Sequence, residues 1–209
     1  MNKIYNDITI ITVLYNSSEI VESFFDSFKN FKIIVVDNGK NEKILERIKN
    51  FKNIEVISKN KNLGYGRAIN FAFNNVSTNF FLVLNPDLSI DVSSIENMLN
   101  TLNQYNDCGI VAPITLPDKD FYGAFPERNL KNVDSSNAIK SRELLLNSKI
   151  EGELCVDVAK GCALLISAKH FKNVGKFNEK YFLFWEEIDI CRKFRSKKTS
   201  VIITPKSIA

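Results

Sequence analysis

Three short polar clusters in the first half of the 209-residue chain are placed where a ligand could bind. Asp37-Asn38-Gly39, Asn62-Leu63-Gly64-Tyr65-Gly66 and Asn85-Pro86-Asp87 each follow an apolar run that is typical of a buried strand. In an open parallel sheet, ligands bind outside the carboxyl ends of the strands. One such cluster is most often only a turn, but three at successive strand ends favour a site for a nucleotide or a nucleotide-linked sugar.

A second group of reactive side chains follows an aromatic run near the end of the chain, with three carboxylates in four residues: Glu186, Glu187 and Asp189. At a helix start the backbone dipole favours anions, whereas mutual repulsion raises the pKa of at least one of them. Helical spacing places Glu187 on the inward, apolar face and pairs Asp189 with Lys193 on the wet side. An inward carboxylate needs a reason, which is either chemistry or a structural cap or ion pair.

The turn Gly64-Tyr65-Gly66 also has some features of a dinucleotide-binding motif. It follows an expected strand, opens an expected helix and has Asp87 about 20 residues farther on. The third small position of that motif holds Ile69, whose branched side chain would obstruct the close contact between helix and strand. The turn also follows the third expected strand and not the first, so a dinucleotide site is disfavoured.

The elements that must position these side chains alternate between β-branched runs and helical patterns, which predicts an α/β fold with a mainly parallel sheet. Strands are expected at residues 8–15, 33–36, 54–57, 80–84, 156–166 and 201–204. Helices are expected at residues 20–28, 44–48, 67–75, 93–102, 168–174 and 186–195, the fourth with a capping box of Ser93 and Glu96. After Pro113 the alternation breaks, and residues 117–150 are expected to form a long excursion with one helix near 141–146. We expect residues 1–209 to form a single domain.

The composition is that of an ordinary globular protein, with 44% hydrophobic and 25% charged residues, which excludes a disordered, collagen-like or coiled-coil chain. The net charge of +4 arises from 22 Lys and 6 Arg against 24 acidic residues, without the arginine-rich signature of a nucleic-acid partner. The apolar runs are shorter than the roughly 18 residues of a membrane span, and residues 1–6 are too polar for a secretory signal. The four cysteines have no Cys-x-x-Cys spacing and are expected to be reduced core residues of a cytoplasmic protein: Cys108, Cys155, Cys162 and Cys191.

Six segments resemble, in order and spacing, the successive motifs of family 2 glycosyltransferases: residues 12–16, 35–39, 62–70, 85–87, 160–163 and 174–192. Within that family the chain is most similar to the bacterial rhamnosyl- and galactofuranosyltransferase-like enzymes of cell-surface polysaccharide synthesis. The resemblance implies a GT-A fold, with a mostly parallel, Rossmann-like nucleotide-binding sheet flanked by helices, and a sugar donor linked to dTDP or UDP. It also implies a divalent metal, Mg²⁺ or Mn²⁺, and inversion at the anomeric carbon. Residues 1–115 would form the nucleotide-sugar-binding half and residues 116–209 the acceptor-side half.

The family's site residues carry over to the positions where its motifs match. The resemblance implies that the donor is bound by Leu14, Tyr15, Asp37 (through the base or ribose), Asn62, Gly64, Gly66, Asn70 and Asn85. Asp87 takes the metal-binding position of the Asp-x-Asp motif, and Mg²⁺ or Mn²⁺ suits carboxylate and phosphate oxygens. The acceptor side is implied to contain Gly161, Cys162 and Trp185. Glu187 falls at the position of the catalytic base, preceded by Glu186, which is better placed for an acceptor or capping contact.

Two departures from the family's pattern leave alternatives open. Most relatives have Asp at position 187, and they continue past the last strand to a His that helps to bind the metal. Here the chain ends at Ala209, and its one histidine, His170, lies in another segment, as expected of a surface or packing residue. The chain is then a fragment without its C-terminal extension, or its metal site is incomplete and it is a non-catalytic sugar-nucleotide-binding module. A nucleotidyltransferase is the other alternative, but Tyr15-Asn16-Ser17-Ser18 lacks the Gly-rich, basic loop that this class needs after its first strand.

The acceptors of this branch are glycans or lipid-linked saccharides, which implies a cytoplasmic protein with peripheral contact at the inner face of the cell membrane. The basic residues that could provide this contact follow the second acidic cluster: Arg192, Lys193, Arg195, Lys197 and Lys198. Each suitably placed charge contributes about 1 kcal/mol near an anionic surface. A solvated helix face is the alternative interpretation of the same residues.

Overall fold

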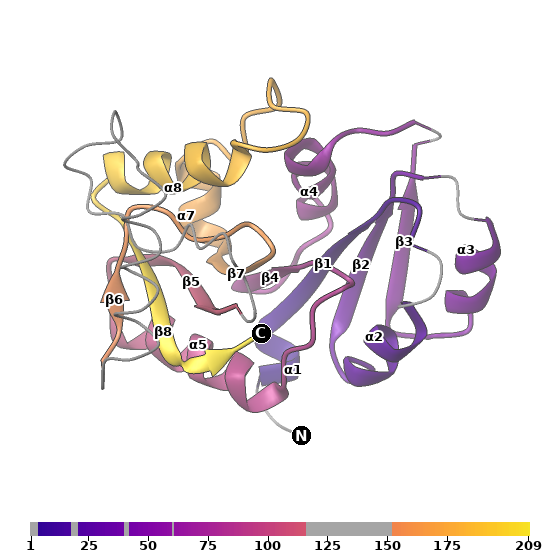
Figure 1. Cartoon of the computed structure of the whole chain (residues 1–209), viewed down its shortest axis with the longest axis horizontal. Coiled ribbons are helices and arrows are strands. Elements are labelled where there is room, and N and C mark those ends of the chain that lie inside the picture. Colours follow the sequence, from indigo (N-terminus) through magenta and orange to yellow (C-terminus); the bar gives the residue numbers. More distant parts are fainter. Residues whose placement is uncertain (1–3, 18–20, 40–41, 60, 116–151) are drawn as a thin grey trace.

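The computed structural model describes residues 4–17, 21–39, 42–59, 61–115 and 152–209 (Figure 1). The strands are β1 Ile8–Leu14, β2 Lys32–Asp37, β3 Ile54–Ser58, β4 Phe80–Leu84, β5 Cys108–Ile114, β6 Leu154–Cys155, β7 Ala163–Ser167 and β8 Ser200–Ile208. The helices are α1 Ile4–Asp7, α2 Val21–Ser27, α3 Glu42–Ile48, α4 Tyr65–Phe73, α5 Val92–Gln104, α7 Ala168–Asn173 and α8 Glu186–Ser196. The excursion expected at residues 117–150, with its helix, lies outside the described residues.

The described strands form one eight-stranded sheet in the order β3-β2-β1-β4-β7-β5-β8-β6. β1 pairs in parallel with β2 and with β4, and β2 pairs in parallel with β3, so the expected parallel sheet is confirmed for this half. The other half is mixed, because β7 runs antiparallel to β4 and β5, and β6 runs antiparallel to β8. The ends of β1, β2 and β4, at Leu14, Asp37 and Leu84, therefore lie along one edge of the sheet.

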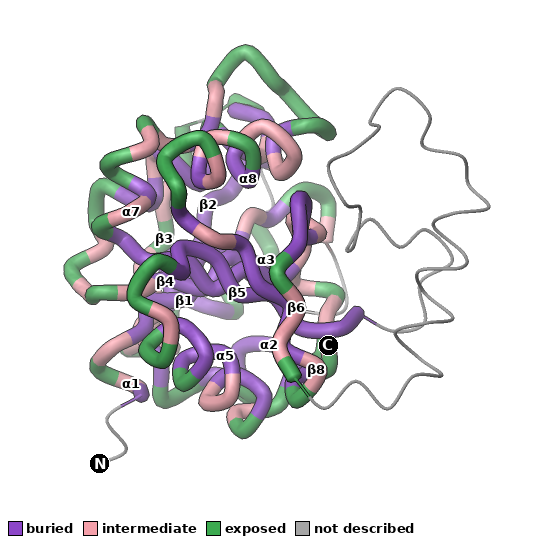
Figure 2. Tube along the Cα trace, turned by 90° about the vertical axis from the view of Figure 1, so that its left-hand side faces the viewer, coloured by how far each residue is buried: buried purple, intermediate pink, exposed green. Residues whose placement is uncertain are grey.

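Helices cover both faces of the sheet, which is buried between them (Figures 1 and 2). Along β1, Ile8 and Ile10 belong to one apolar layer and Ile11 to the other, as the alternation of side chains along a strand requires. Helices α1, α2, α3 and α5 pack on the first layer, through residues such as Phe25, and α4, α7 and α8 pack on the second, through residues such as Phe171. A sheet that is buried on both faces explains why its strands are almost continuously apolar. Among the described helices, none has both the length and the apolar character needed to cross a bilayer.

Two expectations about the strands are wrong. The sequence does not predict β5, because Pro113 breaks its pattern, and the structure accommodates this proline next to a register shift against β8. The strand expected at residues 156–166 is interrupted, since β6 ends at Cys155 and β7 begins at Ala163. Polar Asp157 within this stretch pairs with Arg195 of α8 at 2.7 Å. The intervening loop brings residues 160–162 to the end of β4.

The capping box expected for α5 is also wrong. The helix begins at Val92, and its N-cap is Asp91, whose carboxylate accepts a hydrogen bond from the Ser94 N–H. That hydrogen bond and those of the Ser94 and Ser93 side chains lower the pKa of Asp91. Ser93 lies in the first turn and its hydroxyl donates to Asp91 at 3.0 Å, so it supports the cap without being the cap.

The four cysteines are free thiols, but only two lie in the core. Burial raises the pKa of Cys108 and of Cys191 to about 12, so both remain protonated. Cys155 is exposed on β6, and Cys162 is half-buried in the loop that precedes β7. The expectation that all four are core residues is therefore wrong for this second pair.

Candidate active site

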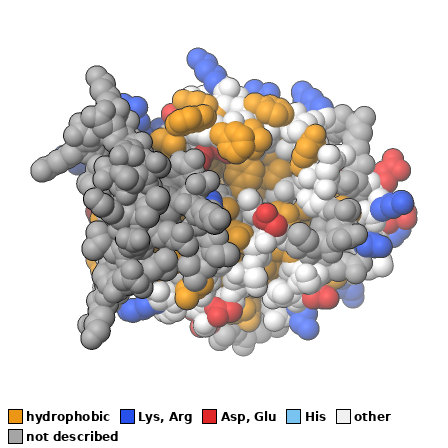
Figure 3. Space-filling model, in the orientation of Figure 1, with side chains coloured by type: hydrophobic (Ala, Val, Ile, Leu, Met, Phe, Trp, Pro, Cys, Tyr) orange, Lys and Arg blue, Asp and Glu red, His pale blue; other side chains and the backbone are white. Residues whose placement is uncertain are grey.

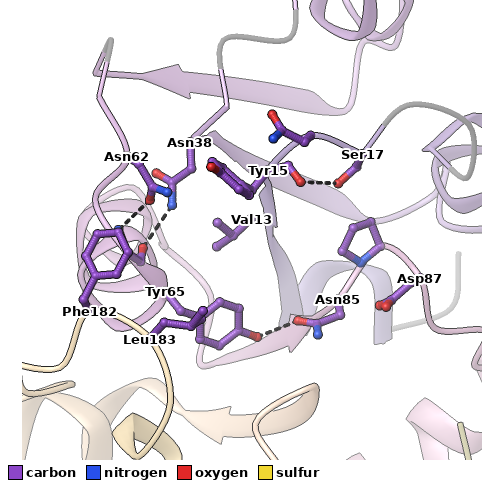
Figure 4. Close-up of a pocket in the computed structure, with 13 residues that line it drawn as sticks. Val13, Tyr15, Ser17, Asn38, Asn62, Tyr65, Asn85, Asp87, Phe182 and Leu183 are labelled. Atoms are coloured by element: carbon purple, nitrogen blue, oxygen red, sulfur yellow. Dashed lines mark hydrogen bonds between the residues drawn. The ribbon is translucent and has the colours of Figure 1, made fainter.

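A cavity of about 780 Å³ opens at the carboxyl ends of β1, β2 and β4 (Figure 4). Tyr15, Asn38 and Asn62 lie toward one end of it, and Asn85 and Asp87 lie toward the other (Figure 4). The three polar clusters at strand ends thus meet in one cavity, as the parallel arrangement of their strands requires. The remaining lining residues are Val13, Asn16, Ser17, Gly64, Tyr65, Pro86, Phe182 and Leu183.

Two asparagine side chains hold the turn between β3 and α4 in place. The Asn62 Oδ1 accepts a hydrogen bond from the Gly64 N–H at 2.8 Å. The Asn38 Oδ1 accepts from the Leu63 N–H at 3.2 Å, and its Nδ2 donates to the Gly64 carbonyl at 3.0 Å (Figure 4). Asn38 therefore ties the end of β2 to the turn, so that the two clusters form one wall of the cavity.

Gly64 allows a distant segment to reach this turn. The Tyr65 N–H, at the start of α4, donates to the Phe182 carbonyl at 2.9 Å. A Cβ on Gly64 would lie 2.2 Å from that carbonyl oxygen, and the backbone of Gly64 has φ 78° and ψ −178°, a conformation that only glycine adopts readily. A residue without a side chain is thus needed here so that the segment before α8 can close one side of the cavity.

Gly64→Ala is expected to destabilise the fold by roughly 3 kcal/mol, because backbone strain and overlap with Phe182 add together. Gly175→Ala is the matched control: its φ is +87°, but a Cβ there would meet nothing within 4 Å, so only the strain remains. Chemical denaturation followed by far-UV circular dichroism measures the stability of both variants. Equal destabilisation of the two variants would contradict the close-approach role of Gly64.

A second cavity, of about 620 Å³, adjoins the first and shares Tyr65, Asn85 and Leu183 with it. Its other walls come from the loop before β7 and from the segment that leads into α8. These lining residues are Lys160, Gly161, Cys162, Phe184, Trp185, Glu186, Glu187 and Ile188. The residues predicted for an acceptor side and the two glutamates are therefore gathered in a cavity of their own.

Tyr65 stands between the two cavities. Its hydroxyl lies 2.8 Å from the Asn85 Oδ1 and 2.9 Å from the Gly161 carbonyl oxygen, and has one proton for these two acceptors. Burial chiefly, together with the charges of the neighbouring carboxylates, raises the pKa of Tyr65 well above its usual value, so it keeps that proton. The Asn85 N–H donates in turn to the Cys162 carbonyl at 2.9 Å. These bonds hold the end of β4, in the first cavity, against the loop before β7, in the second cavity.

Glu186 and Glu187 both face the second cavity but are not equally buried. Glu186 is 5% exposed, and its Oε2 has no hydrogen-bond partner among the described residues. Burial first, and then the charge of Glu187, raises the pKa of Glu186, as expected for one carboxylate of this group. Glu187 is half-buried beside Gly161, where an added Cβ would lie 3.1 Å from the Glu187 Cβ.

Glu187 does pack inward against Gly161, as expected, but Glu186 also faces inward and is the more buried of the two. The reason is the close approach of α8 to α4: a Cβ on Gly66 would lie 3.5 Å from the Glu186 Cβ and 3.1 Å from that of Phe177. Gly66 thus serves helix packing and does not line either cavity. The predicted ion pair of Asp189 with Lys193 is confirmed at 3.2 Å.

Three other residues that were predicted to bind the donor also line neither cavity: Leu14, Asp37 and Asn70. Leu14 is fully buried in the core. Asp37 is buried, its Oδ1 accepts from the Gly39 N–H at 3.1 Å, and its Oδ2 accepts from the Ser58 hydroxyl at 3.4 Å. The carboxylate of Asp37 thus supports the backbone next to Asn38, which does line the first cavity.

Asn70 is bonded to the segment that leads toward the glutamates. Its Nδ2 donates to the Phe177 carbonyl at 2.9 Å and to the Glu179 carboxylate at 3.2 Å. Its Oδ1 accepts from the Phe177 N–H at 3.0 Å. Asn70 lines neither of the two cavities, and these bonds position residues 177–179.

Eight residues that line the first cavity were not among the predicted site residues: Val13, Asn16, Ser17, Asn38, Tyr65, Pro86, Phe182 and Leu183. Asn38 and Tyr65 belong to motifs that the sequence does reveal, but nothing in the sequence shows which member of each motif faces the cavity. The aromatic run that contains Phe182 is visible as well. Its contact with Gly64 depends on tertiary structure alone.

Asp87 is exposed at the first cavity, which it lines together with Asn85. Within the described residues, no group of three or more His, Cys, Asp or Glu side chains could hold a metal. His170 lies on α7 and lines neither cavity. A single carboxylate nevertheless suits Mg²⁺ or Mn²⁺, which commonly take one or two carboxylates and complete their shell with substrate phosphates and water. The donor set therefore fits a metal that is shared with a phosphorylated ligand.

The parallel half-sheet and the cavities at its carboxyl ends belong to the GT-A class of glycosyltransferase folds, which confirms the expected fold. The described fold superposes on GalNAc-T7, solved with UDP, GalNAc and Mn²⁺, with a TM-score of 0.76 at 12% identity, over 98% of this chain and 43% of that one. Residues 9–167 match Glycosyl transferase family 2. The chain therefore belongs to this family.

Two relatives match over most of the chain. The low-salt glycan biosynthesis hexosyltransferase Agl10 of Haloferax volcanii is 26% identical over 205 residues, which cover 94% of this chain and 64% of the relative. The N-acetylglucosaminyl-diphospho-decaprenol L-rhamnosyltransferase of Mycobacterium tuberculosis is 22% identical over 217 residues, which cover 87% of this chain and 68% of the relative. This chain thus spans about two thirds of the length of these two proteins.

Proposed function

We propose that this chain transfers a sugar from a donor linked to UDP or dTDP to a hydroxyl group of a glycan or lipid-linked saccharide, with inversion at the anomeric carbon. The observation that carries the proposal is the pair of adjoining cavities. One contains Asp87 and the polar strand ends, the other contains the glutamates, and Tyr65 and Asn85 separate them. Such an arrangement can hold a donor and an acceptor on either side of one reacting centre.

The first cavity is assigned to the donor. Tyr15, Asn38 and Asn62 would contact the nucleoside, and Asn85 and Asp87 at the other end would lie near the diphosphate. Asp87 would hold Mg²⁺ or Mn²⁺ together with the phosphates of the donor, and a bound ion stabilises the negative charge of a departing diphosphate. The Mn²⁺ in the structure of GalNAc-T7, which also contains UDP, supports this choice of metal.

The second cavity is assigned to the acceptor. Glu187 is half-exposed there and would accept the proton of the acceptor hydroxyl as its oxygen attacks the anomeric carbon. The bond between that carbon and the diphosphate breaks on the opposite face, which inverts the configuration. Glu186, with its raised pKa, would stay protonated more readily and contribute a hydrogen-bond donor beside the base.

The proposal is tested by mixing the full chain with UDP- and dTDP-linked sugars and Mn²⁺, with a short-chain prenyl diphosphate-linked N-acetylglucosamine as acceptor. The name of the Mycobacterium relative motivates this acceptor. We expect a saccharide product of inverted anomeric configuration, detected by mass spectrometry and NMR. Donor binding in calorimetry without product, across the whole donor panel, would instead identify a non-catalytic sugar-nucleotide-binding module.

Asp37→Ala is expected to weaken the binding of UDP or dTDP by roughly 1.5–3 kcal/mol, with or without metal, because its buried carboxylate holds the backbone beside Asn38 in the wall of the donor cavity. Calorimetry with Mn²⁺ and with a chelator measures this difference. Ser58→Ala is the control, because it removes one partner of the Asp37 carboxylate and leaves the charge. A change in the melting temperature of Asp37→Ala with no change in nucleotide affinity would show that Asp37 supports the fold alone and not the donor cavity.

A further inference from the structure

The segment before α8 exposes five large apolar side chains in succession. Residues 181–185, here called the aromatic ridge, are Tyr181 (37% exposed), Phe182 (57%), Leu183 (52%), Phe184 (69%) and Trp185 (65%). Figure 3 shows hydrophobic side chains gathered on the upper part of this face, with Lys and Arg side chains along the edge above them. Contiguous apolar patches of this kind on a folded surface mark a site of interaction with another surface.

The backbone holds the ridge in an unfavourable conformation. Phe184 and Trp185 have φ values of 67° and 71°, in the left-handed region that bulky side chains rarely adopt. The Phe182 carbonyl is anchored on the Tyr65 N–H, and Arg67 of α4 pairs with Glu179 at 3.2 Å. Anchored at its base and strained at its tip, the ridge keeps Phe184 and Trp185 pointing outward. Backbone strain that persists in this way is characteristic of functional segments.

A basic pocket adjoins the base of the ridge. Its volume is about 390 Å³, and its charged lining consists of four cations and one carboxylate: Lys59, Lys61, Arg67, Lys176 and Glu179. The carboxylate is the Glu179 already paired with Arg67, and Lys59 lies 4.3 Å above the ring of Phe71. The pocket is thus strongly positive, and Arg67 and Glu179 connect it to the ridge.

We propose that the ridge and the basic pocket together dock this protein on a bilayer that contains anionic phospholipid. Trp, Tyr and Phe side chains favour the interfacial layer of a membrane. Lysines beside them favour anionic headgroups. A sugar-stacking platform would explain the ridge side chains that line the two cavities, but not the cations of the neighbouring pocket. The match of an apolar ridge with a positive flank therefore selects a membrane surface.

The basic residues at the end of α8 are a weaker candidate for the same contact. Lys193 pairs with Asp189 at 3.2 Å, and Arg195 pairs with Asp157 at 2.7 Å. Both cations are therefore engaged within the protein. The other three are exposed: Arg192, Lys197 and Lys198. Among the described residues, no large apolar side chain between positions 186 and 207 is exposed beside these three, whereas the ridge has five in succession. The docking surface moves from α8, where the sequence suggests it, to the ridge and the pocket.

Docking through the ridge would orient the second cavity, because Leu183, Phe184 and Trp185 also line it. An acceptor saccharide carried on an apolar anchor would then arrive at Glu187 from the membrane side. This consequence rests on the proposed function, whereas the docking itself does not. A vesicle measurement without donor or acceptor therefore separates failure of the docking surface from failure of the proposed reaction.

Trp185 is the one tryptophan of the chain and lies within the ridge, so its fluorescence reports insertion directly. We expect the full chain to show a blue-shifted emission with vesicles of phosphatidylcholine and phosphatidylglycerol, and quenching when brominated lipid is included. Vesicles of phosphatidylcholine alone should give a much smaller effect. Phe184→Ser, which retains Trp185, should weaken partitioning roughly tenfold, since it removes one buried aromatic ring.

Two double variants are compared, of which the first reverses two charges in the basic pocket and the second, the matched control, reverses two charges at the end of α8. Lys59→Glu with Lys61→Glu should weaken partitioning on the order of 30-fold. Lys197→Glu with Lys198→Glu, which changes the net charge equally, should stay close to the unmodified chain. The proposal is overturned if anionic vesicles leave the emission of Trp185 unchanged, or if the second pair abolishes binding and the first does not. A shift produced by soluble oligosaccharide and not by vesicles would overturn it too and make the ridge a sugar platform.

Discussion

Glu187→Gln is expected to lower the rate of sugar transfer by roughly 10²–10⁴-fold, the usual contribution of a positioned general base. The amide preserves the shape of the side chain beside Gly161 but cannot accept the proton of the acceptor hydroxyl. Donor affinity should change little, because Glu187 lines the second cavity and not the first. Single-turnover transfer, with calorimetric titration of the nucleoside diphosphate, measures the two effects separately.

Glu186→Gln is the matched control for this experiment. The pKa of Glu186 is raised in the folded protein, so the neutral form predominates there up to a higher pH, and an amide imitates that form. Its effect on transfer should be clearly smaller than that of Glu187→Gln. If the order is reversed, with Glu186→Gln inactive and Glu187→Gln fully active, then Glu186 is the base and the assignment made here is wrong.

The raised pKa of Glu186 also predicts that the stability of the folded chain depends on pH. Glu186 ionises at its ordinary pKa of about 4.5 when the chain unfolds, but only at a higher pH when it is folded. As the pH rises above about 4.5, the unfolded state therefore loses its proton first, and the free energy of unfolding decreases until the folded-state pKa is passed. Glu186→Gln removes this loss and should raise the stability at neutral pH relative to the unmodified chain. Equal denaturation midpoints at pH 4 and pH 7 for both proteins would contradict the raised pKa.

The fold of the first half could be predicted because local and global signals agree there. The apolar runs of β1, β2 and β4 are buried on both faces, and each is followed by a helix whose apolar positions recur at helical spacing. Where signals conflict, the sequence is a poor guide. Pro113 indicates a break, but β5 continues through it. The apolar run at residues 156–166 predicts one continuous strand, but the chain forms a loop around Gly161 and β7 begins only at Ala163.

The candidate site could be located from the sequence but not resolved into individual contacts. Parallel strands bring their ends to one edge of the sheet, so Asn62, Asn85 and Asp87 could be placed together in advance. By contrast, Gly64 meets Phe182 and Tyr65 meets Gly161 only through long-range packing. The relative burial of the two glutamates likewise depends on how α8 packs on α4, which no local pattern encodes.

Asp87→Ala is expected to abolish the metal dependence of donor binding and to slow transfer on the order of 10³-fold, since a bound ion supplies several kcal/mol of charge stabilisation. Asp87 is exposed at the end of β4, so its loss should leave the fold intact. With the unmodified chain, calorimetry should show tighter binding of UDP or dTDP in Mn²⁺ than in chelator. In the variant, the two titrations should coincide.

Asp26→Ala serves as the control for Asp87→Ala, because it removes an equally exposed carboxylate, on α2, that lines neither cavity. It should retain the Mn²⁺-dependent gain in affinity, which excludes a general effect of net charge on the binding of an anion. Asp87→Asn separates charge from oxygen donation, since its amide can still coordinate a cation, although more weakly than a carboxylate. We therefore expect it to lie between Asp87→Ala and the unmodified chain. An unchanged Mn²⁺ dependence in Asp87→Ala would remove Asp87 from the metal site and leave no carboxylate of the first cavity to hold an ion, because Asp87 is the only Asp or Glu among the described residues that line it.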